Sequence, residues 1–384
     1  MTQTFETLVF PYLNHAVRML ESGYATAADI DNAMRFGCGY PQGPLATLDE
    51  LGPAAVRDGL AARYAETGDH LHRPADLLEK VADEGGSFTG SGDAQAVEPR
   101  WRHEIATIGV VGTGTMASGI AQVFAQSGYD VIVVGRSEEK LAAVTAYVTK
   151  NLDRAIDRGR CDEATRATVL GRLTGTTSRA DLAGVDLVVE AIAEDLAVKT
   201  ELFRELDGIL KPGAILATTT SSLPISELAK ATGRQGDVIG MHFFNPAPVM
   251  KLVEIVTTDL TSPEVDETVR ALTAKAGKVG VSCGDRAGFI VNALLFPYLN
   301  DAVRLAESGA DLAAVDAEVK DVAGFPMGPF ELLDVVGNDV SLAIQEELFR
   351  EFGEPGFAPA SALVAKVESG ELGRKTGRGF HDYR

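Results

Sequence analysis

The apolar positions of the chain change their period twice, and these changes divide it into three parts. Near the start, Leu8, Tyr12 and Ala16 recur at the spacing of one helix face. From residue 104 short apolar runs alternate with helix-length stretches, and over 287–366 the helical spacing returns. Strands that are apolar on both faces and alternate with helices are typical of a parallel, doubly wound sheet. The pattern therefore predicts an α/β domain flanked by two all-α domains.

The strands predicted for the middle part are short apolar runs, and they cover residues 104–111, 129–134, 186–191, 215–218, 238–241 and 252–256. A long helix is predicted over 138–158.

The two helical parts are copies of one unit. The segment FPYLNHAVRMLESG at Phe10–Gly23 matches FPYLNDAVRLAESG at Phe296–Gly309 at eleven of fourteen positions. Gly39–Gly52 matches Gly324–Gly337 at seven of fourteen. Two copies around an unlike middle are too few for a solenoid and indicate a duplicated helical domain.

The length of 384 residues exceeds what one core usually holds. The polar, Gly- and Ser-rich run at 86–103 is typical of a linker. We therefore expect a helical domain at 1–85, this linker, a nucleotide-binding domain at 104–285 and a second helical domain at 286–384.

The charge of the chain bears on its partners. With 55 acidic and 35 basic residues the net charge is −20, which disfavours nucleic acid and anionic membranes as partners. Three scattered cysteines have no metal-binding spacing and are typical of a reducing compartment, so no metal site is predicted. No apolar run is long enough to cross a membrane, and no secretory signal is evident. A cytoplasmic protein is expected.

A glycine-rich turn follows the first predicted strand and opens a helix, which is the context that a dinucleotide-binding loop requires. Gly112 permits the tight turn, Gly114 lets the backbone approach a pyrophosphate, and Ala117 stands where a third glycine is usual. A Rossmann-type domain is predicted, and a glycine-rich turn without a nucleotide is the alternative. The candidate cofactor-binding residues of the loop are Gly112, Thr113, Gly114, Thr115, Met116 and Ala117.

The end of the second predicted strand bears on which dinucleotide binds. NAD enzymes usually place an acidic residue there, whereas this chain has Gly135-Arg136-Ser137. Arg136 and Ser137 could bind a 2′-phosphate, which favours NADP(H) over NAD. In the alternative, Arg136 stacks on the adenine of NAD and Glu138 or Glu139 reaches the ribose.

His242 and Glu254 are the candidate pair for proton transfer. Glu254 lies inside an apolar strand between Val253 and Ile255, where a carboxylate is costly to bury without a partner. The turn between the strands could bring the His242 imidazole to it, and a His oriented by a carboxylate is a common general base. A purely structural hydrogen bond is the alternative.

Seven motifs spread over 104–384 resemble the (S)-3-hydroxyacyl-CoA dehydrogenase family, which includes 3-hydroxybutyryl-CoA dehydrogenases. They are GTGTMASGIAQ (112–122), VVEAIAEDLAVKTELF (188–203), TTSSL (219–223), GMHFFNPAPVMKLVEIV (240–256), DRAGFIVN (285–292), GFPMGPFELLD (324–334) and GRKTGRGF (373–380). The N-terminal unit resembles an extra copy of that family's C-terminal helical domain.

The resemblance implies reversible oxidation of a 3-hydroxyacyl-CoA to the 3-oxoacyl-CoA, in fatty-acid or butanoate metabolism. It implies that His242 takes the hydroxyl proton, that Glu254 orients the imidazole, and that Ser221 and Asn292 complete the catalytic site. Ser221 would also bind the substrate oxygen. Oxidation of free hydroxy acids and a redox-silent nucleotide-binding protein are the rival functions.

The resemblance also assigns binding residues. Glu194 and Lys199 match a pair at the nicotinamide ribose and amide, and Asn245 and Lys375 match further cofactor contacts. The CoA part of the substrate would contact Asn151 and Arg158 in the helix after the second strand. Arg154, one turn before Arg158, could add to a cationic face for its phosphates, and a solvated helix face is the alternative.

The extra copy has Glu6 at the position of Asn292, so it is expected to be non-catalytic. In this family the C-terminal domain makes the homodimer interface. We therefore expect residues 1–85 to pack on 286–384 in cis and favour a monomer, with a homodimer that exchanges the copies as the alternative.

Overall fold

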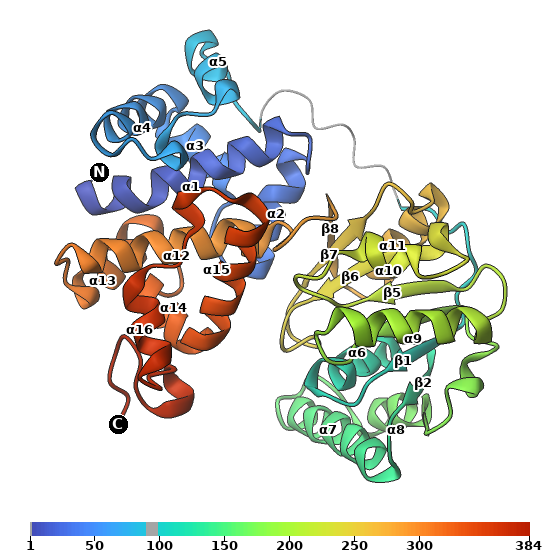
Figure 1. The fold of residues 1–384 in the computed structure, drawn as a ribbon. Coiled ribbons are helices and arrows are strands. Elements are labelled where there is room, and N and C mark those ends of the chain that lie inside the picture. Colours follow the sequence, from blue (N-terminus) through green and yellow to red (C-terminus); the bar gives the residue numbers. More distant parts are fainter. Residues whose placement is uncertain (1, 90–98) are drawn as a thin grey trace. The chain divides into compact units, whose positions relative to one another are not determined.

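The computed structural model of the chain describes residues 2–89 and 99–384 (Figure 1). The chain divides into two compact units: Val97–Asp285, and a discontinuous unit made of Met1–Ala96 with Arg286–Arg384. Within the predicted linker, residues 90–98 lie outside the described residues. Both of its ends are bonded: Phe88 N–H donates to Asp49 (2.8 Å) and Arg102 N–H donates to Thr268 (3.2 Å).

The unit Val97–Asp285 contains an eight-stranded sheet of order β3-β2-β1-β4-β5-β6-β7-β8. Its strands are β1 (Thr107–Val111), β2 (Asp130–Val134), β3 (Leu173–Thr176), β4 (Leu187–Glu190), β5 (Ile215–Thr218), β6 (Val238–Phe243), β7 (Leu252–Thr257) and β8 (Val279–Gly284). Its helices are α6 (Thr115–Gln126), α7 (Glu138–Asp157), α8 (Glu163–Gly171), α9 (Leu196–Ile209), α10 (Ile225–Lys230) and α11 (Pro263–Lys275), with short 3-10 turns at Arg179–Leu182 and Gln235–Asp237.

The six predicted strands are all present, and most of their residues are apolar on both faces. Every residue of β4, β5 and β6 is buried, as expected for strands covered by helices on both sides. The predicted parallel, doubly wound sheet is confirmed for β1 to β6, but one edge of the sheet departs from it. β7 runs antiparallel to β6, and β8 pairs in parallel with β7, so these two strands oppose the others.

Two edge strands were not predicted. β3 (LTGT) is short and half-exposed, and β8 (VGVSCG) is buried only at alternate positions, Val281 and Cys283. An edge strand needs little apolar sequence because only part of it is covered, so the apolar runs that mark central strands are missing here.

The discontinuous unit is helical and contains two copies of a five-helix arrangement. The first copy has α1 (Gln3–Glu21), α2 (Ala27–Gly37), α3 (Pro44–Leu51), α4 (Pro53–Thr67) and α5 (Asp76–Glu84), with a 3-10 turn at His70–His72. The second has α12 (Val291–Glu307), α13 (Leu312–Ala323), α14 (Pro329–Val336), α15 (Asn338–Phe352) and α16 (Ser361–Glu368), with 3-10 turns at Pro355–Phe357 and Arg374–Thr376.

The same buried polar side chain fixes the long helix in each copy. Asn14 Oδ1 accepts from Ala75 N–H (2.8 Å), and Asn300 Oδ1 accepts from Ala360 N–H (2.8 Å). Both asparagines also donate from Nδ2 to backbone carbonyls of the segment before the last helix. A buried amide must be satisfied, so this residue type locks the connection in both copies.

The two copies pack on each other through α1 and α12, which lie side by side in Figure 1. The contact is reciprocal around aromatic rings. Tyr12 meets its counterpart Tyr298 with ring centroids 5.9 Å apart, and Tyr40 stacks on Phe325 at 3.7 Å with 5° between the planes. Matching residues that contact each other are the mark of a two-fold interface, here formed within one chain.

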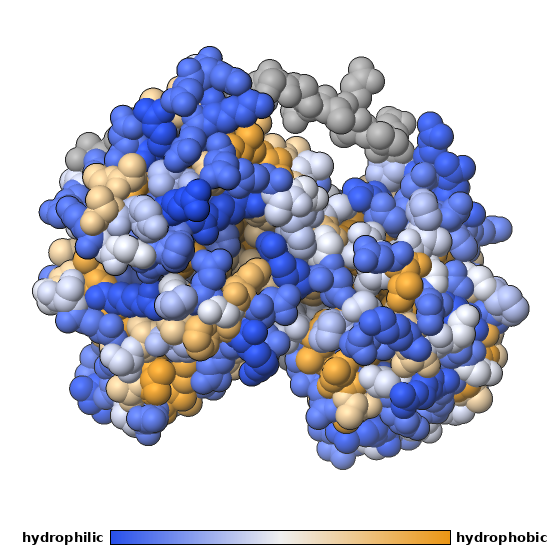
Figure 2. Space-filling model, turned by 45° about the horizontal axis from the view of Figure 1, so that its top comes forward, coloured by the Kyte–Doolittle hydropathy of each residue, from blue (hydrophilic) through white to orange (hydrophobic). Residues whose placement is uncertain are grey.

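The surface is mainly hydrophilic on the face shown in Figure 2, with scattered apolar residues. The most exposed large apolar side chain among the described residues is Val249, at 72% exposure. Over 2–89 and 99–384, the helices are all too short or too polar to cross a membrane.

The reciprocity between the copies fails at one partly buried position. His15 of α1 and its counterpart Asp301 of α12 line the same small cavity. Burial, together with Arg286 and Arg18, lowers the pKa of His15 to about 3. Burial raises the pKa of Asp301 to about 7, although Arg304 opposes the shift.

Asp301→Asn should therefore stabilise the chain at alkaline pH only. The folded chain keeps the Asp301 proton up to about pH 7 and the unfolded chain loses it near 3.8, so stability falls as pH rises through this window. We expect Asp301→Asn to raise the free energy of unfolding by about 1–3 kcal/mol at pH 8 and not at pH 4, in urea titrations.

The matched variant Asp321→Asn, at an exposed position of α13, should show no such dependence. Equal differences from the wild type at both pH values would contradict the assignment to Asp301.

Candidate active site

The glycine loop lies between β1 and α6. Gly112 has φ +137°, and a Cβ there would lie 2.3 Å from the carbonyl oxygen of Ala191, so only glycine fits. Gly114 differs, because its φ is −74° and a Cβ would meet nothing within 4 Å. Neither the backbone nor packing requires a glycine at 114. Its missing side chain suits the close approach of a ligand.

Thr113 lies in the loop between Gly112 and Gly114, and Thr115 and Met116 are the first two residues of α6. Gly114 is the residue that precedes the helix, and no side chain caps it. The N–H groups of the first turn therefore form a potential anion site. Ala117 is fully buried, and its Cβ lies 3.2 Å from where a Gly112 Cβ would be. The small side chain at 117 thus allows the tight turn.

Arg136 follows β2 and is exposed. Its guanidinium makes no hydrogen bond or ion pair within 2–89 and 99–384. Ser137 caps the start of α7, where its Oγ accepts from Lys140 N–H at 3.3 Å. The acids Glu138 and Glu139 are exposed in the first turn of the helix.

His242 and Glu254 are direct cross-strand partners in the antiparallel pair β6–β7. Directly opposed residues have their side chains on the same face of a sheet, a few ångströms apart. Here Nδ1 of His242 is 2.6 Å from Oε2 of Glu254, and the side chains are 10% and 0% exposed. The carboxylate favours the tautomer with its proton on Nδ1, which places the basic lone pair of the imidazole on Nε2.

A second buried carboxylate, Glu190 at the end of β4, was not identified from the sequence. Its Oε1 lies 2.7 Å from Lys199 Nζ and its Oε2 accepts from Thr218 Oγ1 at 2.6 Å. Glu190 and Lys199 are 0% and 1% exposed. The signal was available, since Glu190 ends the apolar run DLVVE much as Glu254 interrupts its own strand.

Glu194 joins this network to the segment after β5. Oε2 of Glu194 lies 3.3 Å from Lys199 Nζ. Oε1 of Glu194 accepts from Thr220 Oγ1 (2.6 Å) and from Ser221 N–H (2.9 Å). Burial raises the pKa of Glu194, but Lys199 and these donors outweigh it and hold the pKa below its usual value. Glu194 is therefore an ionised carboxylate that fixes Ser221.

The structure thus brings the predicted residues of the α/β unit into a common place. β1, β4, β5 and β6 are parallel, so the loop after β1, Glu190, Thr218 and His242 all lie at the carboxyl edge of the sheet. Asn245 follows β6 and is exposed. Asn292 and Lys375 belong to the helical unit, where Lys375 pairs with Asp339.

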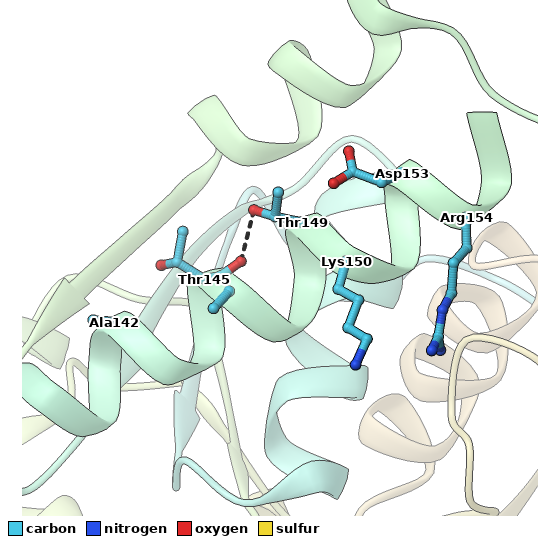
Figure 3. Close-up of a pocket in the computed structure, with 7 residues that line it drawn as sticks. Ala142, Thr145, Thr149, Lys150, Asp153 and Arg154 are labelled. Carbon is cyan, nitrogen blue, oxygen red and sulfur yellow. Dashed lines mark hydrogen bonds between the residues drawn. The ribbon is translucent and has the colours of Figure 1, made fainter. Parts of the chain in front are cut away.

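The predicted CoA contacts on α7 differ from each other. Asn151 Nδ2 donates to Gln122 Oε1 of α6 (3.0 Å), so its amide already has a structural partner. Arg158 is exposed just past the end of the helix. A hollow of about 710 Å³ runs along α7. Lys150 and Arg154, which line it, point the same way from the helix (Figure 3). Lys150 was not predicted, although it stands one helical turn before Arg154.

The strand order, the glycine-rich turn and the site at the carboxyl edge define a dinucleotide-binding oxidoreductase domain of the Rossmann type. Residues 107–286 match the family model of the 3-hydroxyacyl-CoA dehydrogenase NAD binding domain. Residues 5–95 and 288–383 each match the C-terminal domain of the same enzymes. The chain belongs to the 3-hydroxyacyl-CoA dehydrogenase family, and it carries a duplicated C-terminal domain.

Relatives of known name agree with this family. A 3-hydroxybutyryl-CoA dehydrogenase of Mycobacterium tuberculosis is 46% identical over 286 residues, which cover 73% of this chain and 99% of the relative. The 3-hydroxybutyryl-CoA dehydrogenase of Clostridioides difficile is 42% identical over 277 residues, which cover 72% of this chain and 99% of the relative. Among solved structures, the (S)-3-hydroxybutyryl-CoA dehydrogenase of Ralstonia eutropha has a TM-score of 0.72 at 40% identity and covers 73% of this chain and 100% of that one.

Glu190→Gln should destabilise the chain strongly. The isosteric amide removes the charge that faces Lys199 at 2.7 Å, and a buried ammonium without its full partner is costly. We expect the free energy of unfolding to fall by about 2–4 kcal/mol in urea titrations.

A matched variant, Glu227→Gln, removes the partner of Lys230 from an ion pair whose side chains are 51% and 57% exposed. It should cost less than about 0.5 kcal/mol. Similar losses for the two variants would show that burial does not set the strength of the Glu190 pair.

Proposed function

We propose that the chain catalyses the reversible oxidation of a (S)-3-hydroxyacyl-CoA, such as 3-hydroxybutyryl-CoA, to the 3-oxoacyl-CoA in fatty-acid or butanoate metabolism. The observation that carries the proposal is the buried His242–Glu254 pair at the same sheet edge as the glycine loop. The relatives' names supply the class of substrate.

The proposed roles follow from the geometry of the pair. His242 accepts the proton of the 3-hydroxyl at Nε2, and Glu254 holds the ring and stabilises the imidazolium that results. A dinucleotide bound along the glycine loop would supply the acceptor for the hydride from C3. Ser221, which Glu194 fixes, and Asn292 donate hydrogen bonds to the substrate oxygen as its charge changes.

The dinucleotide is proposed to lie along the loop from Gly112 to Ala117. Asn245 and Lys375 supply further contacts. Lys199 is 1% exposed and tied to Glu190 and Glu194, so we infer that it acts on the nicotinamide half through Glu194. The family model shows an NAD-binding domain. Beyond this, we propose that the unpaired Arg136 favours NADP(H), with NAD as the alternative.

The CoA part of the substrate is proposed to bind along α7. Lys150 and Arg154 line one hollow and offer two cations to its phosphates, and Arg158 lies one further turn along. Asn151 would act by holding α7 to α6 through Gln122.

Reduction of acetoacetyl-CoA tests the function and the cofactor together. We expect oxidation of the reduced dinucleotide, followed by absorbance, with NADPH faster than NADH. A rate with NADH that is equal or higher would keep the reaction and remove the argument from Arg136. No turnover with either would contradict the proposed function.

A test variant and a matched control examine the role of Glu254. Glu254→Gln should lower kcat about 10²–10⁴-fold, because the amide cannot stabilise the imidazolium. Glu264→Gln changes an exposed carboxylate in the first turn of α11 and should leave kcat unchanged.

We further propose that the duplicated domain makes the enzyme a monomer, since α1 already covers α12. Sedimentation velocity of the full chain should show one species near 40.6 kDa over a wide concentration range. A chain that lacks residues 1–85 should dimerise through the exposed face of α12. A tight dimer that this deletion does not alter would contradict the proposal.

A further inference from the structure

The segment between β6 and β7, residues 244–251, has to keep His242 and Glu254 in register. It contains Asn245, two prolines and the exposed Val249, and it forms no regular secondary structure. A segment of this kind has few backbone hydrogen bonds of its own, so other parts of the chain must fix its path.

A single ammonium group binds this segment at two points. Lys278 Nζ donates to the carbonyl oxygen of Ala247 at 2.6 Å and to that of Met250 at 2.7 Å. Lys278 directly precedes β8, and the N–H of the next residue, Val279, donates to Lys251 O at 2.8 Å. The start of β8 therefore holds the segment through both its backbone and a charged side chain.

Helix α6 meets the segment from another direction. A Cβ on Gly119 would lie 3.2 Å from Ala247 Cβ and 3.1 Å from Pro248 Cδ. These distances are too short for ordinary contact, so glycine at 119 allows the segment to lie against the dinucleotide-binding helix. The segment is thus fixed between α6 and Lys278.

The chemistry of Lys278 is unusual for a purely structural lysine. It is half-buried, and within the described residues it forms no ion pair with a carboxylate. Burial lowers the pKa of Lys278 to about 8. An ammonium held by two carbonyl dipoles in place of a counter-ion loses hydration without the usual compensation.

We propose that Lys278 is a positioning residue for the dehydrogenase reaction. By holding Ala247 and Met250, it fixes the segment that joins the His242 strand to the Glu254 strand and that carries Asn245. The inference rests on the proposed function, because it assigns His242 to proton transfer and Asn245 to the dinucleotide.

The test compares Lys278→Met with Lys278→Arg in the full chain. Lys278→Met fills similar space without donors and should lower kcat about 10–100-fold, as expected when reacting groups shift by a fraction of an ångström to one ångström. The KM for the reduced dinucleotide should rise, while the KM for acetoacetyl-CoA stays within about twofold. Lys278→Arg can still donate to both carbonyls and should recover kcat to within about threefold of the wild type.

Lys275→Met is the matched control. It removes a charge three residues earlier, where Lys275 lies over the rings of Trp101 and Tyr129, away from the segment. It should leave kcat and both KM values unchanged. If Lys278→Met does not fold, Gly119→Ala, which pushes on the same segment from α6, should show the same loss of kcat and rise in dinucleotide KM.

Three results would overturn the proposal. They are a Lys278→Met enzyme with wild-type kinetics, one with a lower Tm and unchanged kcat, and a Lys278→Arg enzyme as slow as Lys278→Met. Should the wild type itself fail to reduce acetoacetyl-CoA, the proposed function fails separately. Fluorescence titration with NADPH and NADH would then test the positioning role of Lys278. That role predicts that Lys278→Met binds the dinucleotide more weakly than Lys275→Met does.

Discussion

The reversal of the chain between β6 and β7 is the constraint on which the site depends. In a wholly parallel sheet, neighbouring strands are joined by a crossover, and a residue near the end of one strand does not meet a residue twelve positions later. Because β7 runs back along β6, His242 and Glu254 become direct partners, and a carboxylate that would be costly to bury gains an imidazole at 2.6 Å. The turn that permits this reversal is irregular, and α6 and Lys278 hold it in place.

Buried carboxylates recur across the sheet edge with different partners. Glu254 is paired with a titratable ring, whereas Glu190 is paired with Lys199 and Thr218. In the first arrangement a buried carboxylate orients an imidazole. In the second, Lys199 also reaches Glu194, which accepts from the N–H of Ser221. A single physical rule, that a buried charge needs a partner, therefore accounts for both arrangements at this edge of the sheet.

The sequence was sufficient for the elements whose residues are buried on both faces, and for the duplicated helices, which share runs of identical residues. It was insufficient for β3 and β8, because edge strands lack continuous apolar runs, and for the direction of β7, which depends on tertiary pairing. At the candidate site, Glu254 was found as a charge inside an apolar strand. Glu190 carried the same signal but stood at the end of its strand, where a charge usually meets solvent.

The two helical copies show which residues folding needs and which it does not. Both keep the asparagine that locks the last helix, Asn14 and Asn300, because loss of a buried amide's partner is costly in either copy. At the interface the copies are free to differ, since one chain no longer has to match itself. His15 and Asp301 occupy one cavity where a symmetric dimer would place two identical residues. Fusion of the two copies into one chain thus removes the self-complementarity that a two-fold interface imposes, and an asymmetric pair becomes possible.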